Sequence, residues 1–172
     1  MSAAPGEAIV HADGRLAFQG RMFRCALGRG GVVAAKRKHE GDGGTPSGTL
    51  KLLRVYYRAD REPIPRTVLP RVPLAQDDLW CDDPGRVEYN RLVRRPFEGG
   101  HEVMWRDDAL YDVVGELGWN TGPVVRGRGS AIFLHLARPD YGPTEGCVAL
   151  ARADLLALLA GGLTALRVLP PG

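Results

Sequence analysis

Two residues near the C-terminal end of the chain have the side chains that nucleophilic catalysis needs. Cys147 offers a thiol, and His135 lies twelve positions before it. Only the thiolate attacks carbonyl groups well, and a free cysteine, with a pKa of about 8.5, is mostly protonated at neutral pH. A neighbouring imidazole can take the thiol proton. The pair is therefore a candidate nucleophile and base, and the alternative is a buried strand histidine beside a small apolar cysteine.

The segment around His135 alternates as a β-strand does. One face is the more apolar, and it is formed by Ser130, Ile132, Leu134 and Leu136. Phe133 and His135 fall on the other face, because side chains on a strand alternate with period two. We therefore expect His135 to point away from the apolar face of its strand.

A loop with proline and glycine, residues 138–143, separates this strand from the cysteine. Such a loop can return the chain so that Cys147 meets His135. Gly146 lacks a Cβ and permits a tight turn. We expect the backbone N–H groups of Gly146 and Cys147 to converge there on a developing oxyanion.

These residues resemble the YkuD-type L,D-transpeptidase family. The family has a strand histidine, a loop, and then [Ser/Thr]-His-Gly-Cys followed by an aliphatic residue. Here His135 and residues 144–148, Thr-Glu-Gly-Cys-Val, match that pattern. The family's upstream Thr-Pro-x-Gly turn is matched by residues 45–48, Thr-Pro-Ser-Gly. The two motifs occur in the family's order, and the resemblance covers roughly the whole chain.

Three positions depart from the family pattern. Glu145 stands where the family has histidine, Ala149 where it has arginine, and Leu136 where it commonly has glycine. In relatives a main-chain carbonyl or a small side chain after the strand histidine often completes the triad, so the resemblance implies at most the Leu136 backbone in that role here. No metal or cofactor is implied.

Five side chains are candidates for substrate binding. The resemblance places four of them around the nucleophile, and the fifth precedes the strand of His135: Arg138, Tyr141, Thr144, Glu145 and Asn120. The amide of Asn120 can orient His135 or bind substrate, and the alternative is that it stabilises a turn.

The resemblance implies a substrate and a reaction. Cys147 would accept an acyl group from the meso-diaminopimelate position of a peptidoglycan tetrapeptide stem, releasing D-Ala, and pass it to an amine of another stem. The changes at Glu145 and Ala149 favour a 1,3 cross-link, from L-Ala to diaminopimelate, over the 3,3 cross-link. Hydrolysis by an L,D-carboxypeptidase or amidase, and a non-catalytic peptidoglycan-binding module, are the alternatives. A binding module would need neither Cys147 nor His135.

We also expect His135 to stabilise a Cys147 thiolate, which would then alkylate faster than Cys25 or Cys81.

Composition is that of one soluble domain, residues 1–172. The chain has 172 residues, 44% of them hydrophobic and 25% charged, with a net charge of +3. The mild positive charge suits an anionic polymer or an ordinary surface. Residues 28–31 lack the setting of a phosphate loop, and nothing indicates a nucleic-acid partner. The oligomeric state stays open.

The three cysteines are too few and too scattered for a disulfide scaffold, and none forms a C-x-x-C pair that would hold a metal. Cys25 and Cys81 can form one bridge, or remain two buried thiols. The first ten residues have neither a basic nor a continuous apolar region, so no export signal is readable, and no segment is long enough to span a membrane. The resemblance nevertheless implies action in the periplasm or cell wall.

The remaining pattern is mostly that of strands. A hairpin is predicted over residues 8–18 around Asp13-Gly14, further strands over 22–27, 49–57, 109–117 and 163–169, and one helix over 152–160. Residues 58–73 and 76–100 show no clear period and are predicted to be irregular insertions that wall the substrate. The predicted fold is mainly β, a sandwich or irregular barrel with one or two short helices.

Overall fold

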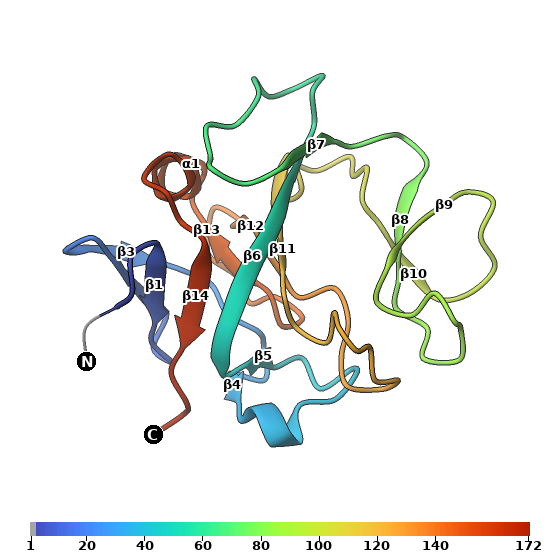
Figure 1. Ribbon diagram of the computed structural model, residues 1–172, viewed down its shortest axis with the longest axis horizontal. Helices are drawn as coiled ribbons and strands as arrows, with labels where there is room; N and C mark the ends of the chain where they lie inside the picture. Colours follow the sequence, from blue (N-terminus) through green and yellow to red (C-terminus); the bar gives the residue numbers. More distant parts are fainter. Residues whose placement is uncertain (1–2) are drawn as a thin grey trace.

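The structure, a computed structural model, describes residues 3–172 and consists mainly of β-strands (Figure 1). The strands of the main sheet are β1 (Glu7–Val10), β2 (Arg15–Phe18), β3 (Arg21–Arg24), β6 (Gly48–Tyr57), β7 (Arg71–Pro73), β11 (Val113–Leu117), β12 (Phe133–Leu136), β13 (Val148–Leu150) and β14 (Ala165–Val168). Their spatial order is β13-β12-β11-β6-β14-β1-β2-β3, and β7 adds to β6. The predicted mainly β fold is confirmed, as is the hairpin of β1 and β2.

The two ends of the main sheet meet. Ala26, just after β3, exchanges two backbone hydrogen bonds with Ala149 of β13, with N···O distances of 2.8 and 2.9 Å. Nearby, Thr144 N donates to Leu27 O (3.0 Å) and Arg29 N donates to Thr144 O (2.8 Å). A sheet joined at both edges is a barrel. Of the two predicted architectures, the irregular barrel is therefore the observed one.

Strand β12 is buried on both faces. Leu134 and Leu136 belong to the core inside the barrel. Phe133 belongs to a second apolar cluster outside it, where it packs edge-on against Trp80 with ring centroids 5.0 Å apart. Since side chains alternate along a strand, His135 lies on the Phe133 side. The predicted orientation of the histidine, away from the leucines, is confirmed.

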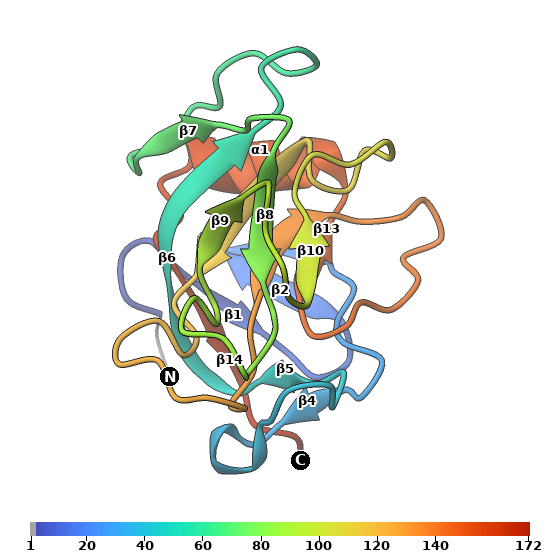
Figure 2. The ribbon, with the colours of Figure 1, turned by 90° about the vertical axis from the view of Figure 1, so that its right-hand side faces the viewer.

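Residues 76–100 are more regular than predicted. They contain β8 (Asp78–Cys81) and β9 (Leu92–Arg94), which pair with β10 (His101–Val103) in a second sheet of order β10-β8-β9. Figure 2 shows this sheet in front of the main sheet. All four residues of β8 are buried, so the alternation that marks a half-exposed strand is absent. Of the insertion predicted over residues 58–73, residues 58–70 do lack helix and strand, whereas residues 71–73 form β7.

The other regular elements are short. They are β4 (Val32–Val33) and β5 (Thr45–Pro46), which pair in parallel, the 3₁₀ turn η1 (Ala35–Arg37) and the helix α1 (Arg152–Ala160). Helix α1 has the predicted bounds and buries Leu155, Leu158 and Leu159. Within residues 3–172, no helix is long and apolar enough to cross a membrane.

The three cysteines, Cys25, Cys81 and Cys147, are buried and unbridged. Of the two alternatives for Cys25 and Cys81, the structure therefore has two buried thiols. Cys25 lies in the barrel core, whereas Cys147 belongs to the cluster outside it. The two thiols thus have different surroundings, so the pKa and the alkylation of Cys147 can be compared with those of Cys25.

Thr45, in the Thr-Pro-Ser-Gly motif, supports the turn that carries the cysteine. The side chain is fully buried, and its Oγ1 accepts the Gly28 N–H (2.9 Å) and lies 3.5 Å from the Cys147 carbonyl oxygen. Gly28 is equally constrained, because a Cβ there would lie 2.2 Å from the Gly43 carbonyl oxygen. The motif therefore connects the barrel closure to the cysteine turn.

We expect Thr45→Val, which keeps the shape but removes the acceptor for Gly28, to lower the free energy of unfolding by about 1–3 kcal/mol. Urea unfolding measures this change. Thr49→Val, at an exposed position of β6, is the matched control and should change stability by less than about 0.5 kcal/mol. Equal effects of the two substitutions would contradict the role given to Thr45.

Candidate active site

The turn before Cys147 is held by its own side chains. Thr144 Oγ1 donates to the Cys147 carbonyl oxygen (2.8 Å) and accepts the Gly146 N–H (3.1 Å). Gly146 has φ +134°, and a Cβ there would lie 2.8 Å from the Gly44 carbonyl oxygen, so this position requires glycine. In this state the Gly146 N–H therefore donates to Thr144, and its expected role toward an oxyanion stays a prediction. The Cys147 N–H has no acceptor among residues 3–172.

The thiol of Cys147 lies between two backbone groups at the start of β12. Its Sγ is 3.2 Å from the Ala131 carbonyl oxygen, to which it donates, and it accepts the Phe133 N–H at 3.4 Å. Ala131 has a left-handed backbone with φ +53°. The sulfur is therefore held by the main chain of the strand that carries His135.

The imidazole of His135 is held on two sides. Nδ1 lies 2.8 Å from the Leu136 carbonyl oxygen, and the Tyr111 ring packs edge-on with ring centroids 5.2 Å apart. A carbonyl oxygen only accepts, so Nδ1 carries a proton and Nε2 is the basic nitrogen. The partner of Nδ1 is the Leu136 backbone that the resemblance implied.

The thiol and the imidazole are both neutral at pH 7. Burial lowers the pKa of His135 to about 4. Burial raises the pKa of Cys147 to about 12, and the negative charge of Glu102 adds to the rise. Burial therefore opposes the expected thiolate in this state, and burial also raises the pKa of Cys25 to about 12. A buried ion pair would cost more than the two neutral groups.

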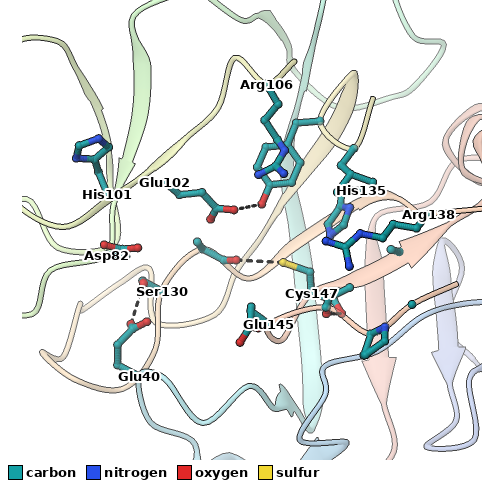
Figure 3. A pocket seen from close by; sticks show the side chains of 17 residues that line it. Glu40, Asp82, His101, Glu102, Arg106, Ser130, His135, Arg138, Glu145 and Cys147 are labelled. Carbon is teal, nitrogen blue, oxygen red and sulfur yellow. Dashed lines mark hydrogen bonds between the residues drawn. The ribbon is translucent and has the colours of Figure 1, made fainter. Parts of the chain in front are cut away.

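His135 and Cys147 line one cavity of about 400 Å³ (Figure 3). In that view Cys147 lies between His135 and a group of carboxylates on the opposite side. These carboxylates belong to Glu40, Asp82 and Glu102. The cavity thus places Cys147 between the imidazole and a wall of carboxylates.

Three of the five candidate substrate-binding residues line this cavity. They are Arg138, Thr144 and Glu145, whose carboxylate also pairs with Arg29 (Nε···Oε2 2.8 Å). Both members of that ion pair are exposed, so it is weak.

The other two candidates do not line the cavity. Tyr141 packs under the Arg24 guanidinium, 4.2 Å from its ring centre. The amide of Asn120 donates to the carbonyl oxygens of Val125 (2.9 Å) and Gly129 (3.0 Å), and its Oδ1 accepts the Val125 N–H (2.7 Å). Asn120 therefore stabilises its own loop, which was the alternative to a role in substrate binding.

The residues that sequence reasoning missed come from separate segments. Glu40, Asp82, Glu102, Arg106 and Tyr111 all line the cavity. Ser130 Oγ donates to Glu40 Oε2 (2.8 Å), and the Tyr111 hydroxyl donates to Glu102. No spacing in the sequence indicates this group, because only the docking of the second sheet on β11 and β12 brings its members together.

The lowered pKa of His135 predicts a dependence of stability on pH. The unfolded chain takes up a proton on this histidine below its ordinary pKa of 6.5, whereas the folded protein does so only near pH 4. Stability therefore falls as the pH falls from 6.5 to 4, by roughly 3 kcal/mol from this group. In urea unfolding, His135→Asn should lose less stability over this range than the original protein. His39→Asn, at an exposed histidine, is the control. Parallel pH profiles for His135→Asn and the original protein would contradict the burial of a neutral imidazole.

Comparison with known proteins gives one family. Residues 7–161 match the family model YkuD, described as the L,D-transpeptidase catalytic domain. No curated protein matches the chain. Among solved structures, L,D-transpeptidase 1 of Mycobacterium tuberculosis is similar at 10% identity and a TM-score of 0.39, over 94% of this chain and 60% of that one. The match to the family model covers most of the chain, which therefore belongs to the YkuD family of L,D-transpeptidase catalytic domains.

Proposed function

We propose that this protein is a peptidoglycan L,D-transpeptidase that uses Cys147 as its nucleophile. The acyl donor is the meso-diaminopimelate position of a tetrapeptide stem, the leaving group is D-Ala, and the acceptor is an amine of another stem. The observation that supports this most is the thiol of Cys147 and the imidazole of His135 on one cavity, in a chain of this family.

The first half of the reaction forms a thioester. Nε2 of His135 takes the Cys147 proton while the sulfur attacks the carbonyl carbon, and the imidazolium then protonates the leaving D-Ala amine as the C–N bond breaks. The hydrogen bond from Nδ1 to Leu136 keeps the ring oriented. Because the resting pair is neutral, proton transfer accompanies attack instead of preceding it. The Cys147 N–H is the donor left open for the oxyanion.

The second half transfers the acyl group to an amine. The acceptor nitrogen attacks the thioester and gives a proton to His135, and the thiolate leaves and is reprotonated. Carboxylates on the far wall suit an approaching amine: burial raises the pKa of Asp82 and of Glu102, and the charge of Glu40 adds to both rises. A cationic group at this wall would relieve that repulsion. Arg138 offers a partner for a substrate carboxylate.

The proposed substrate lies in the cell wall, so we place the protein's action there or in the periplasm. Its partners are peptidoglycan stem peptides. Hydrolysis is the same chemistry with water as the acceptor, and a product without a cross-link would identify it.

The first test is turnover of disaccharide tetrapeptides, followed by mass spectrometry. We expect a cross-linked dimer and free D-Ala, and Cys147→Ala should lower the rate at least about a thousandfold. Cys25→Ala, which removes a buried thiol from the barrel core, is the control and should keep the activity. A folded protein that gives neither a covalent adduct nor turnover contradicts the proposal, and a Cys147→Ala variant that keeps its full cell-wall effect would indicate a binding module.

The second test concerns the bond that is formed. Glu145 and Ala149 replace the residues that the family commonly has beside the nucleophile, and Glu145 lines the cavity, so we propose a 1,3 cross-link from L-Ala to diaminopimelate. Fragmentation of the dimers by tandem mass spectrometry locates the bond. Dimers with only 3,3 bonds would rule this preference out and leave the transpeptidase assignment intact.

A further inference from the structure

The backbone just before β12 has a conformation that needs support from outside the segment. Ala131 has φ +53°, in the left-handed region that a residue with a Cβ avoids. Its methyl side chain makes no hydrogen bond that could hold this conformation. Such strain persists only where the surrounding structure fixes it.

The support comes from Asn90, which follows β8 in the second sheet's connecting segment. Its Oδ1 accepts the N–H of Ala131 (3.0 Å) and the Nε1–H of Trp80 (2.9 Å). Its Nδ2 donates to the carbonyl oxygens of Trp119 (3.0 Å) and Asn120 (2.7 Å). An amide side chain has two donors and two acceptor sites, so all of them are used. The side chain is also 5% exposed, which shields these bonds from water.

Asn90 holds the peptide group before the Cα of Ala131, and the peptide group after that Cα meets the nucleophile. The carbonyl oxygen of Ala131 accepts the Cys147 thiol at 3.2 Å, and the N–H of Phe133 points to the same sulfur at 3.4 Å. In the extended conformation that Ala131 would otherwise adopt, the orientation of its peptide groups would differ. The left-handed residue therefore decides where the acceptor for the thiol lies.

We propose that Asn90 is a positioning residue: its amide oxygen accepts the Ala131 N–H and holds the left-handed backbone of Ala131, which orients the next carbonyl group toward the Cys147 thiol. This inference deepens the proposed function and rests on it in one respect: it affects turnover only if Cys147 is the nucleophile. Asn90 does not line the cavity and touches neither Cys147 nor His135 directly. Its effect reaches the sulfur through the backbone of Ala131, from the N–H on one side of the Cα to the carbonyl oxygen on the other.

The residue before Asn90 fixes the neighbouring part of the same segment. The Tyr89 hydroxyl accepts the Gly129 N–H (3.0 Å) and donates to Glu40, which also accepts the Ser130 hydroxyl (2.8 Å). Two successive residues of the second sheet's connection thus hold three successive residues ahead of β12. Through these two residues, the second sheet helps to position the nucleophile.

Loss of the Asn90 side chain should change two rates in opposite directions, the alkylation of Cys147 and the turnover of substrate. A hydrogen bond donated by the thiol favours its protonated form, so its loss makes the thiolate easier to form and alkylation by a small reagent faster. The same loss leaves the sulfur misoriented for a bound peptide, so turnover slows. A general loosening of the fold would not separate these two measurements in this way.

The test uses Asn90→Gly, since glycine accepts the φ of +57° found at this position and removes only the side chain. Iodoacetamide alkylation is followed at each cysteine by peptide mapping between pH 6 and 9. We expect Cys147 to react about fivefold faster than in the original protein at pH 7, with Cys25 unchanged. With tetrapeptide substrate, kcat should fall at least about tenfold and KM should change little. Asn90→Asp keeps an oxygen for the Ala131 N–H, so its alkylation rate and kcat should lie between those of the original protein and of Asn90→Gly.

Leu79→Ala is the matched control, because Leu79 is a fully buried residue of β8 with no contact to Asn90 through a side-chain hydrogen bond. It should lower Tm without changing the ratio of Cys147 to Cys25 alkylation. Unchanged alkylation and kcat in folded Asn90→Gly would overturn the proposal, and so would the same pair of changes in Leu79→Ala.

If Asn90→Gly does not fold, hydrogen exchange in the original protein gives the answer. The Ala131 amide should exchange as slowly as the amides of β12, and exchange as fast as in the exposed residues 121 and 122 would overturn the proposal. If the original protein shows no turnover, the proposed function fails. The alkylation and exchange measurements still decide whether Asn90 holds the Ala131 backbone.

Discussion

The pairing of Ala26 with Ala149 is the constraint on which the site depends. It joins the free edge of β13 to the segment after β3, so the strand that follows Cys147 is bonded on both sides. In the parallel register of β12 and β13, His135 lies opposite Ala149, two positions after Cys147. Parallel neighbours need a connection of about a dozen residues. The spacing between the histidine and the cysteine is therefore a consequence of strand geometry as well as a feature of the motif.

Strand β12 separates two environments. Its leucine face fills the barrel, where close packing gives stability, and its other face carries Phe133 and His135 toward the second sheet. Trp80 of β8 covers Phe133 edge-on, and the cavity opens beside it. Because the barrel core stabilises the strand, the outer face can hold polar groups at a cost that the core offsets.

Burial determines the protonation states of Cys147 and His135. A thiol and an imidazole that are both out of water stay neutral, and each is hydrogen-bonded to a backbone carbonyl, Ala131 for Cys147 and Leu136 for His135. Carboxylates gather instead on the cavity wall, where burial raises the pKa of Asp82 and of Glu102 and the charge of Glu40 adds to both rises. The pair thus gains its ionic form only as the reaction proceeds, in surroundings from which most water is excluded.

Local chemistry in the sequence determined the hairpin at Asp13-Gly14, the bounds of α1 and the face on which His135 lies. Each of these follows from a period or a turn within a few residues of chain. Only the tertiary structure decided the strands of residues 76–100, the carboxylate wall, the bonds that use up Asn120, and the contact of Tyr141 with Arg24. The reason is physical: alternation shows which face of a strand is buried, but it does not show which distant segment buries it. The thiol's hydrogen bond to Ala131 depends on which distant segment packs there, and so does the protonation state of the nucleophile.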